Sequence, residues 1–382
     1  MPLQPRDLLK AKMKPTPLSA LPEDGVATEQ HDYSSASSDS SGVSASSAST
    51  ITPADFNFRR PQRIPTSDTE PLPWSDFFAH ELDLHPDPSS PSTFRMYYNP
   101  PNSITGPLFV AHHGAGSSAL SFGLLASEIQ RLMAGKAGFL CFDARGHGST
   151  QVENEHDLSL LTLGDDMAAV VGAVQTKFGW EKLPDIVLVG HSLGGAVVTD
   201  LANRRLLGPA VMGVAVFDVV EGSAIEALKH MHRILEARPA GFASIAQATE
   251  WHLRTRVLRN KRSARLSVPP LLLEETSGGP KPFRWRTDLV STSPSWSHWF
   301  LNLSSKFLSI PASKLLILAG TDRLDKPLMI GQMQGKYQLN VFPEAGHFLH
   351  EDCPERTAEV LVEFWRRNDR GALVLPKKIG EM

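Results

Sequence analysis

The sequence has few of the features that mark secreted, membrane-spanning or nucleic-acid-binding proteins. It contains only two cysteines, Cys141 and Cys353, among 382 residues. Cys141 falls within an apolar pattern typical of a strand, so we expect two free thiols in a reducing compartment. No apolar run approaches the roughly 18 residues that span a bilayer, no secretory signal is visible, and the net charge is −3. We expect an intracellular protein without nucleic-acid or membrane partners, in the cytoplasm or also in the nucleus.

Motifs of metal-dependent chemistry are also missing. The 14 histidines include no His-Glu-x-x-His pattern, and the two cysteines form no Cys-x-x-Cys pair. These are the spacings that hold zinc in many enzymes and small domains. We therefore expect neither a metal nor a cofactor.

Composition divides the chain into five segments. Ten of the sixteen residues from Ser34 to Ser49 are serine, and such a tract cannot bury enough surface to offset the entropy of ordering it. This start is either a phosphorylated regulatory tail or an inert extension. The segments are a disordered tail (1–68), a first core part (69–222), an insertion (223–310), a second core part (311–370) and a C-terminal tail (371–382).

Between the two tails, apolar strand patterns alternate with helical ones. Such alternation predicts an α/β fold with a mostly parallel sheet covered by helices on both faces. The insertion breaks this rhythm, because it holds four of the seven tryptophans and several helical patterns but no clear strand. We expect it to form a helical cap over the carboxyl edge of the sheet. The expected strands are 94–100, 107–114, 138–148, 186–189, 211–220, 313–320 and 337–343, and the expected helices are 119–133, 161 onward, 193–206 and 355–368.

A serine stands where one strand pattern changes abruptly into a helix, in "VLVGHSLGGA". Small residues on both sides of Ser192 let the backbone bend sharply, as in the nucleophile elbow of hydrolases. The alternative is a glycine-rich turn with a helix-capping serine. A nucleophilic serine needs a base, an orienting acid and an oxyanion hole, which belong in loops at the carboxyl ends of strands.

Candidates for each partner follow other strands. His347, in "FPEAGHFLHED", lies late in the chain after the last strand and is the expected base. Its rival His350 is expected to pack or to cap a helix. The loop "HHGAGSS" and the turn after Ser192 would supply the backbone N–H groups of Ala115 and Leu193 as the oxyanion hole.

Two aspartates can orient the histidine. Asp218 and Asp322 both end predicted strands, and neither position excludes the other. Asp143 and Arg145, in "FDARGHG", are expected to be structural residues of the rim. The order Ser, Asp, His on this strand–helix pattern predicts a serine enzyme of the α/β-hydrolase fold.

Longer strings are more specific. "PLPWSDFF", "FDVVEGSAIEAL" and "LAGTDRLDKPLMIGQMQGKYQLNVFPEAGHFLHED" together resemble the protein phosphatase methylesterases over roughly residues 71–367. The resemblance implies Ser192, Asp218 and His347 as the triad. It also implies hydrolysis, through an acyl-enzyme, of the methyl ester on the C-terminal leucine of the protein phosphatase 2A catalytic subunit.

Two other functions stay open at this point. One is a small-molecule esterase or acyltransferase with the same triad, and the other is a catalytically silent protein that binds the phosphatase. A basic segment in the insertion, "RTRVLRNKRSAR" (254–265), is either a solvated helix face or a surface for an acidic partner.

Overall fold

The apolar runs of the sequence form the inner strands of an eight-stranded sheet. The computed structural model describes residues 69–103, 106–275, 279–320 and 324–369. The strands lie in the order β1-β2-β4-β3-β5-β6-β9-β10. Their bounds are His80–Leu84 (β1), Phe94–Asn99 (β2), Leu108–His112 (β3), Gly138–Phe142 (β4), Ile186–His191 (β5), Val211–Phe217 (β6), Ser313–Leu318 (β9) and Gln338–Val341 (β10).

The sheet is mostly parallel, which confirms the expected fold class. β3 pairs in parallel with β4 and β5, and parallel pairing continues through β6 and β9 to β10. Only β1 and β2 add antiparallel pairs at one edge. The edge strand β1, "HELDL", was not predicted, because its five residues alternate polar with apolar too briefly to stand out.

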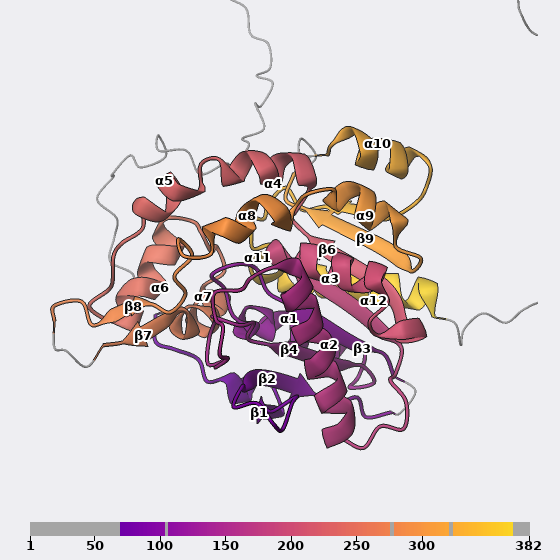
Figure 1. The fold of residues 1–382 in the computed structure, drawn as a ribbon, viewed down its shortest axis with the longest axis horizontal. Coiled ribbons are helices and arrows are strands. Elements are labelled where there is room, and N and C mark those ends of the chain that lie inside the picture. The colour runs from indigo at the N-terminus through magenta and orange to yellow at the C-terminus, as the bar shows by residue number, and fades with distance from the viewer. Residues whose placement is uncertain (1–68, 104–105, 276–278, 321–323, 370–382) are drawn as a thin grey trace, which may run out of the picture. The chain divides into compact units, whose positions relative to one another are not determined.

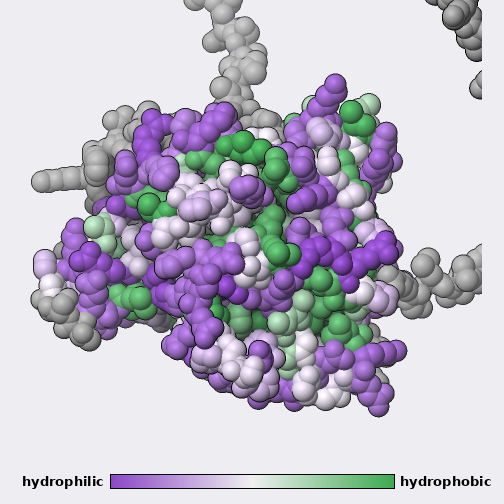
Figure 2. Space-filling model, in the orientation of Figure 1, coloured by the Kyte–Doolittle hydropathy of each residue, from purple (hydrophilic) through white to green (hydrophobic). Residues whose placement is uncertain are grey.

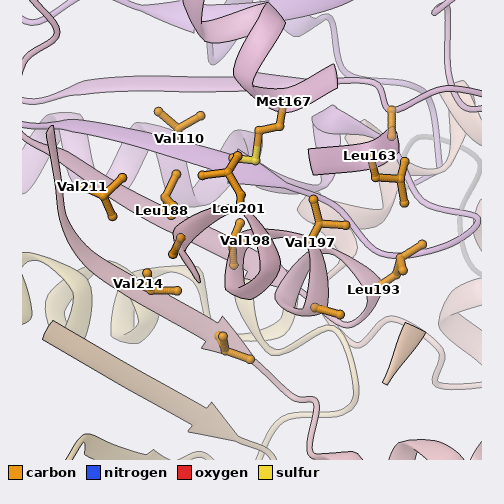
Figure 3. Packing of buried hydrophobic residues seen from close by; sticks show 14 of the residues in the cluster. Val110, Leu163, Met167, Leu188, Leu193, Val197, Val198, Leu201, Val211 and Val214 are labelled. Carbon is orange, nitrogen blue, oxygen red and sulfur yellow. The ribbon is translucent and has the colours of Figure 1, made fainter. Parts of the chain in front are cut away.

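Helices cover both faces of this sheet (Figure 1). Alternate residues of a strand point to opposite faces, and the buried residues divide accordingly into two clusters. Val110, Leu188 and Val214 pack with α2 and α3 on one face (Figure 3), whereas Phe109 and Val187 pack with α1 and α12 on the other. The helices are α1 (Gly123–Leu132), α2 (Leu160–Lys177), α3 (Leu193–Arg204) and α12 (Pro354–Asn368).

The insertion after β6 is helical in its described residues, apart from one short hairpin. Its helices are α4 (Glu221–Leu228), α5 (Met231–Glu236), α6 (Ile245–Arg254), α7 (Lys261–Ser267), α8 (Ser293–Trp299) and α9 (Leu303–Ser309). The hairpin of β7 (Leu272–Glu274) and β8 (Phe283–Trp285) was not expected, because strands of three residues leave no periodic pattern.

The insertion contacts loops at the carboxyl edge of the sheet. The indole N–H of Trp299 donates to the Leu158 carbonyl at 2.7 Å, and Arg286 pairs with Glu155 at 3.0 Å. Both acceptors belong to the loop after β4. The two expected tails and Asp322 lie outside the described residues.

On the face that Figure 2 shows, apolar residues lie among polar ones. Hydrophobic colour shows over α4 and over α10 (Lys326–Met333), where Ile225, Met329, Ile330 and Met333 are exposed. No helix among the described residues has the length and apolar character to cross a membrane.

Candidate active site

The turn between β5 and α3 places Ser192 in a strained backbone conformation. Its φ is 52° and its ψ is −118°, a combination that L-residues seldom adopt and that clusters at functional sites. The turn also requires glycine on both sides. A Cβ at Gly190 would lie 2.2 Å from the Gly194 carbonyl oxygen, and a Cβ at Gly194 would lie 2.0 Å from the His112 carbonyl oxygen.

Ser192 stands at the N-cap position of α3, but its side chain makes no capping hydrogen bond. Within the described part of the chain, its hydroxyl has no hydrogen bond at all. The Ser192 Cβ faces the loop after β3, since a Cβ at Gly114 would come within 3.1 Å of it. This geometry favours a hydroxyl available for chemistry over the capping role considered from the sequence.

Asp218 directly follows β6, and His347 lies in the segment after β10. Their side chains are in contact. His347 Nδ1 lies 2.8 Å from Asp218 Oδ2, and the Ala319 N–H donates to Asp218 Oδ1 at 2.9 Å. The Asp218 side chain is fully buried, whereas the His347 side chain is 45% exposed. The competing aspartate, Asp322, lies outside the described residues.

This pairing determines which nitrogen of His347 can act as a base. A carboxylate only accepts hydrogen bonds, so Nδ1–H must be the donor to Asp218. Nε2 then carries the free lone pair in the neutral imidazole, as a general base requires. The acid thus orients the ring and leaves one nitrogen available to a nucleophile.

His191, directly before Ser192, contacts the segment that carries His347. Its Nε2 lies 2.9 Å from the His347 carbonyl oxygen, and the two rings are 4.7 Å apart. Burial lowers the pKa of His191 well below its usual value. The ring is therefore neutral at physiological pH and donates Nε2–H to the carbonyl, which holds His347 beside the elbow.

The loop after β3 is held by His147. Gly116 N–H donates to His147 Nε2 at 2.8 Å, and His147 Nδ1 lies 2.8 Å from the Arg145 carbonyl oxygen. Burial lowers the pKa of His147 to about 4, so the ring stays neutral and can accept through Nε2. By contrast, within the described residues the N–H groups of Ala115 and Leu193 donate to no acceptor. Both remain available to a substrate oxygen.

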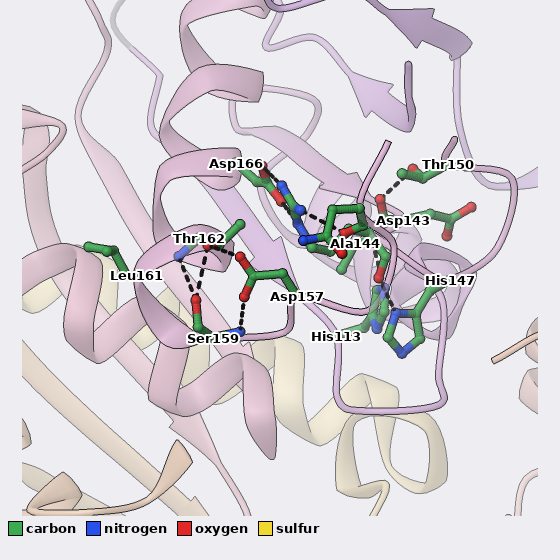
Figure 4. Close-up of polar contacts among 12 residues, drawn as sticks. His113, Asp143, Ala144, His147, Thr150, Asp157, Ser159, Leu161, Thr162 and Asp166 are labelled. Carbon is green, nitrogen blue, oxygen red and sulfur yellow. Dashed lines mark hydrogen bonds and ion pairs between the residues drawn. The ribbon is translucent and has the colours of Figure 1, made fainter. Parts of the chain in front are cut away.

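A second buried histidine joins the same loop to the end of β4 (Figure 4). His113 Nδ1 lies 2.8 Å from the Gly114 carbonyl oxygen, and its Nε2 accepts from Ala144 N–H at 3.0 Å. Burial keeps the pKa of His113 well below its usual value. The neutral ring can therefore donate at one nitrogen and accept at the other.

Asp143 and Arg145 brace the rim, in the structural roles expected of them. Asp143 accepts from the backbone N–H groups of Ala119 and Ser149, at 2.8 and 2.9 Å. Arg145 forms a two-pronged pair with Asp166 on α2, with distances of 2.6 and 2.7 Å (Figure 4). Both contacts fix the loop that carries His147.

His350 packs in the core, one of its two expected roles. It is fully buried, its ring lies 4.7 Å from those of Phe122 and His191, and neither ring nitrogen has a hydrogen-bond partner in the part of the chain that the structure describes. Among the described residues, no three His, Cys, Asp or Glu side chains are grouped so that they could hold a metal ion.

Known proteins are similar to this chain over most of its length. The model of the alpha/beta hydrolase family matches residues 108–360. Protein phosphatase methylesterase 1 of Aspergillus oryzae is 55% identical over 327 residues, 83% of this chain and 76% of the relative. The chain belongs to the protein phosphatase methylesterase family. The Aspergillus fumigatus protein of the same name is 53% identical over 357 residues, 91% of this chain and 84% of the relative.

Solved structures agree on the fold alone. E-2-(acetamidomethylene)succinate hydrolase superposes with a TM-score of 0.58 at 19% identity, covering 75% of this chain and 99% of the other. The family membership therefore rests on the methylesterase relatives, and the resemblance noted in the sequence is confirmed.

Sequence reasoning missed the histidines that position this methylesterase-family site. His113, His147 and His191 each stand beside a glycine, at the carboxyl end of a strand or in the loop that follows it. That placement is the signal that could have found them, although their hydrogen bonds become visible only in three dimensions.

The basic segment 254–265 is partly structural. Arg259 N–H donates to Asp352 Oδ1 at 2.8 Å, and its guanidinium also contacts the Glu344 carbonyl oxygen. Arg265 Nε donates to the Glu70 carbonyl oxygen at 2.6 Å. These two arginines join α7 to the His347 segment and to the start of the described chain, whereas Arg254 and Arg256 remain exposed.

Proposed function

We propose that this protein hydrolyses the methyl ester on the C-terminal leucine of the protein phosphatase 2A catalytic subunit. Membership of the methylesterase family supports the ester class and a phosphatase as the substrate protein. The observation that carries the chemistry is the 2.8 Å contact between His347 Nδ1 and Asp218, beside a serine held at positive φ.

The proposed reaction uses the residues of this site in two half-reactions. His347 Nε2 takes the proton of Ser192 while the serine oxygen attacks the ester carbonyl. The N–H groups of Ala115 and Leu193 stabilise the negative charge on the carbonyl oxygen. The imidazolium then protonates the leaving methanol, and a water attacks the acyl-enzyme by the same route. The product is a free carboxylate.

The test compares Ser192→Ala with wild type on carboxymethylated phosphatase 2A and on nitrophenyl acetate. We expect both activities and labelling by a fluorophosphonate probe to disappear, because only binding and oxyanion stabilisation remain. Ser223→Ala, whose serine lies on α4 and donates to the Val220 carbonyl, is the matched control.

The other functions give different outcomes. Wild-type protein that hydrolyses nitrophenyl acetate but leaves the phosphatase methylated would indicate a small-molecule esterase. Phosphatase binding without hydrolysis of either substrate would indicate a silent binder. Probe labelling that persists in Ser192→Ala would place the nucleophile elsewhere.

A further inference from the structure

One arginine of the insertion is stacked on a tryptophan and has no acidic partner among the described residues. The guanidinium carbon of Arg238 lies 3.6 Å from the centre of the Trp285 ring. Stacking of this kind leaves the five N–H donors in the guanidinium plane directed outward. Within the described residues, these donors reach no carboxylate, carbonyl or hydroxyl.

The other half-buried arginines differ from Arg238 in their hydrogen bonding. Among the described residues, each of them has a hydrogen-bond acceptor for its side chain. These arginines are Arg95 (Asp83), Arg145 (Asp166), Arg204 (Asp165), Arg259 (Glu344 carbonyl), Arg265 (Glu70 carbonyl) and Arg286 (Glu155). Burial lowers the pKa of Arg238 to about 10, and no acidic group of the described segments offsets this effect. Arg238 thus stays charged at pH 7 and carries an uncompensated desolvation cost.

The surroundings hold this guanidinium in place. Trp285 Nε1 donates to the Pro239 carbonyl oxygen at 2.8 Å, next to Arg238 in the chain. Phe242 and Phe283 exchange backbone hydrogen bonds of 2.8 and 3.2 Å, which bind the segment after Arg238 to β8. His252, whose ring lies 5.7 Å from that of Trp285, is buried and has its pKa lowered to about 4, so it adds no charge to the aromatic cluster of Phe242, Trp251 and Trp285.

The cluster lies close to the oxyanion loop. Leu289, four residues beyond Trp285, is the side chain that a Cβ at Gly116 would meet at 2.9 Å. Four residues of chain span at most about 14 Å. A peptide that extends from the ester carbonyl rises about 3.3 Å per residue, so it covers this distance within about four residues.

We infer that Arg238, preorganised on Trp285, binds a carboxylate side chain of the protein substrate near its esterified C-terminus. This inference rests on the proposed function, because it assumes that a peptide chain leads into the site. A planar carboxylate fits two N–H donors of one guanidinium in parallel. The acidic residue would lie about three to five positions before the esterified leucine.

The test uses synthetic peptides that end in leucine methyl ester. One series carries a single Asp at each of the six positions before the leucine, and the matched series carries Asn. For wild type, we expect kcat/KM to be roughly 10- to 100-fold higher for Asp at the preferred position than for Asn, the range of a charged hydrogen bond. The difference should lie mainly in KM.

Two substitutions of Arg238 distinguish the effect of the guanidinium on substrate preference from any effect on folding. Arg238→Ala should abolish the preference for Asp, and Arg238→Lys should keep only part of it, because an ammonium lacks the planar fork. Arg233→Ala, an exposed arginine on α5, is the matched control and should keep the full preference. All three variants should hydrolyse nitrophenyl acetate as wild type does, which also shows that they are folded.

Different experimental results would contradict the inference and the proposed function. Peptide esters that wild type cleaves with equal kcat/KM for Asp and Asn overturn the role of Arg238 alone. A preference that survives unchanged in both Arg238 variants does the same. Wild type that demethylates the phosphatase but cleaves no peptide ester also overturns the role of Arg238. Wild type that cleaves nitrophenyl acetate but neither a peptide ester nor the methylated phosphatase overturns the proposed function.

Discussion

Ser192 and Asp218 share an uncommon backbone feature at the ends of neighbouring strands. Their φ angles are 52° and 48°, in the left-handed region that costs a non-glycine residue about 1–3 kcal/mol. In each case the N–H continues the ladder to the next strand. Ser192 N–H donates to Phe217 O at 3.0 Å, and Asp218 N–H donates to Ile317 O at 2.8 Å. Hydrogen bonds of the sheet therefore fix the backbone of both residues in the same way, at the ends of the adjacent strands β5 and β6.

The choice between the two aspartates leads to the first prediction. Asp218→Asn should lower turnover by a factor on the order of 10⁴, because an amide can leave the imidazole in the wrong tautomer. The fold should survive, since asparagine tolerates positive φ better than most residues. Turnover of nitrophenyl acetate and circular dichroism are the two measurements.

Asp322→Asn is the matched comparison. We expect it to lose far less activity, because His347 Nδ1 already has its acid in Asp218. A larger loss in Asp322→Asn than in Asp218→Asn would show that the assignment is wrong. The strand pattern alone left these two open, because both aspartates end predicted strands, and the family resemblance implied Asp218. The contact with the ring becomes visible only in the fold.

At the scale of elements, the elbow depends on glycines that no other residue can replace. Gly194→Ala should destabilise the protein by about 3 kcal/mol or more, because the new Cβ would lie 2.0 Å from the His112 carbonyl oxygen. This steric clash cannot be relieved by a side-chain movement, because the atoms that the Cβ would meet belong to the backbone of His112 and His113. Urea unfolding followed by circular dichroism measures the change.

Gly172→Ala provides the opposite case within the same protein. Gly172 lies within α2 and is exposed, and a Cβ there meets nothing within 4 Å. Alanine should stabilise this helix by up to about 1 kcal/mol. A Gly194→Ala protein as stable as wild type would contradict the steric account of the elbow.

The sequence predicted the elements whose signal is local. Continuous apolar runs such as Ile186–Val189 identify buried parallel strands without help from the rest of the chain. The strands that were missed, β1 and the β7–β8 hairpin, are short and get their stability from neighbours distant in the sequence. The same holds for the site, where Ser192 and His347 follow local patterns but His147 acquires its role from Gly116 in another loop.

At the scale of the whole molecule, one buried acid couples folding to pH. Glu351 is 2% exposed, its Oε2 has no hydrogen-bond partner among the described residues, and burial raises its pKa to about 8. The unfolded chain releases this proton near the ordinary value for glutamate, about 4.3. Stability from the protonated group is therefore fully present below about pH 4 and is lost as the pH rises to about 8.

Glu351→Gln should remove this dependence. The free energy of unfolding should exceed that of wild type by a few kcal/mol at pH 8, with little difference at pH 4. Glu355→Gln, on the exposed first turn of α12, is the control and should follow wild type. Equal pH profiles for wild type and Glu351→Gln, measured by urea unfolding, would show that Glu351 is already ionised in the folded protein.

The tryptophans of the insertion have a spectroscopic consequence. Trp251, Trp285, Trp296 and Trp299 all belong to it, and Trp296 and Trp299 are buried. Intrinsic fluorescence therefore reports mostly on the insertion, whereas far-ultraviolet circular dichroism averages over the whole fold. If the insertion loosens before the sheet, the emission will shift at lower denaturant than the ellipticity, with no label attached to the protein.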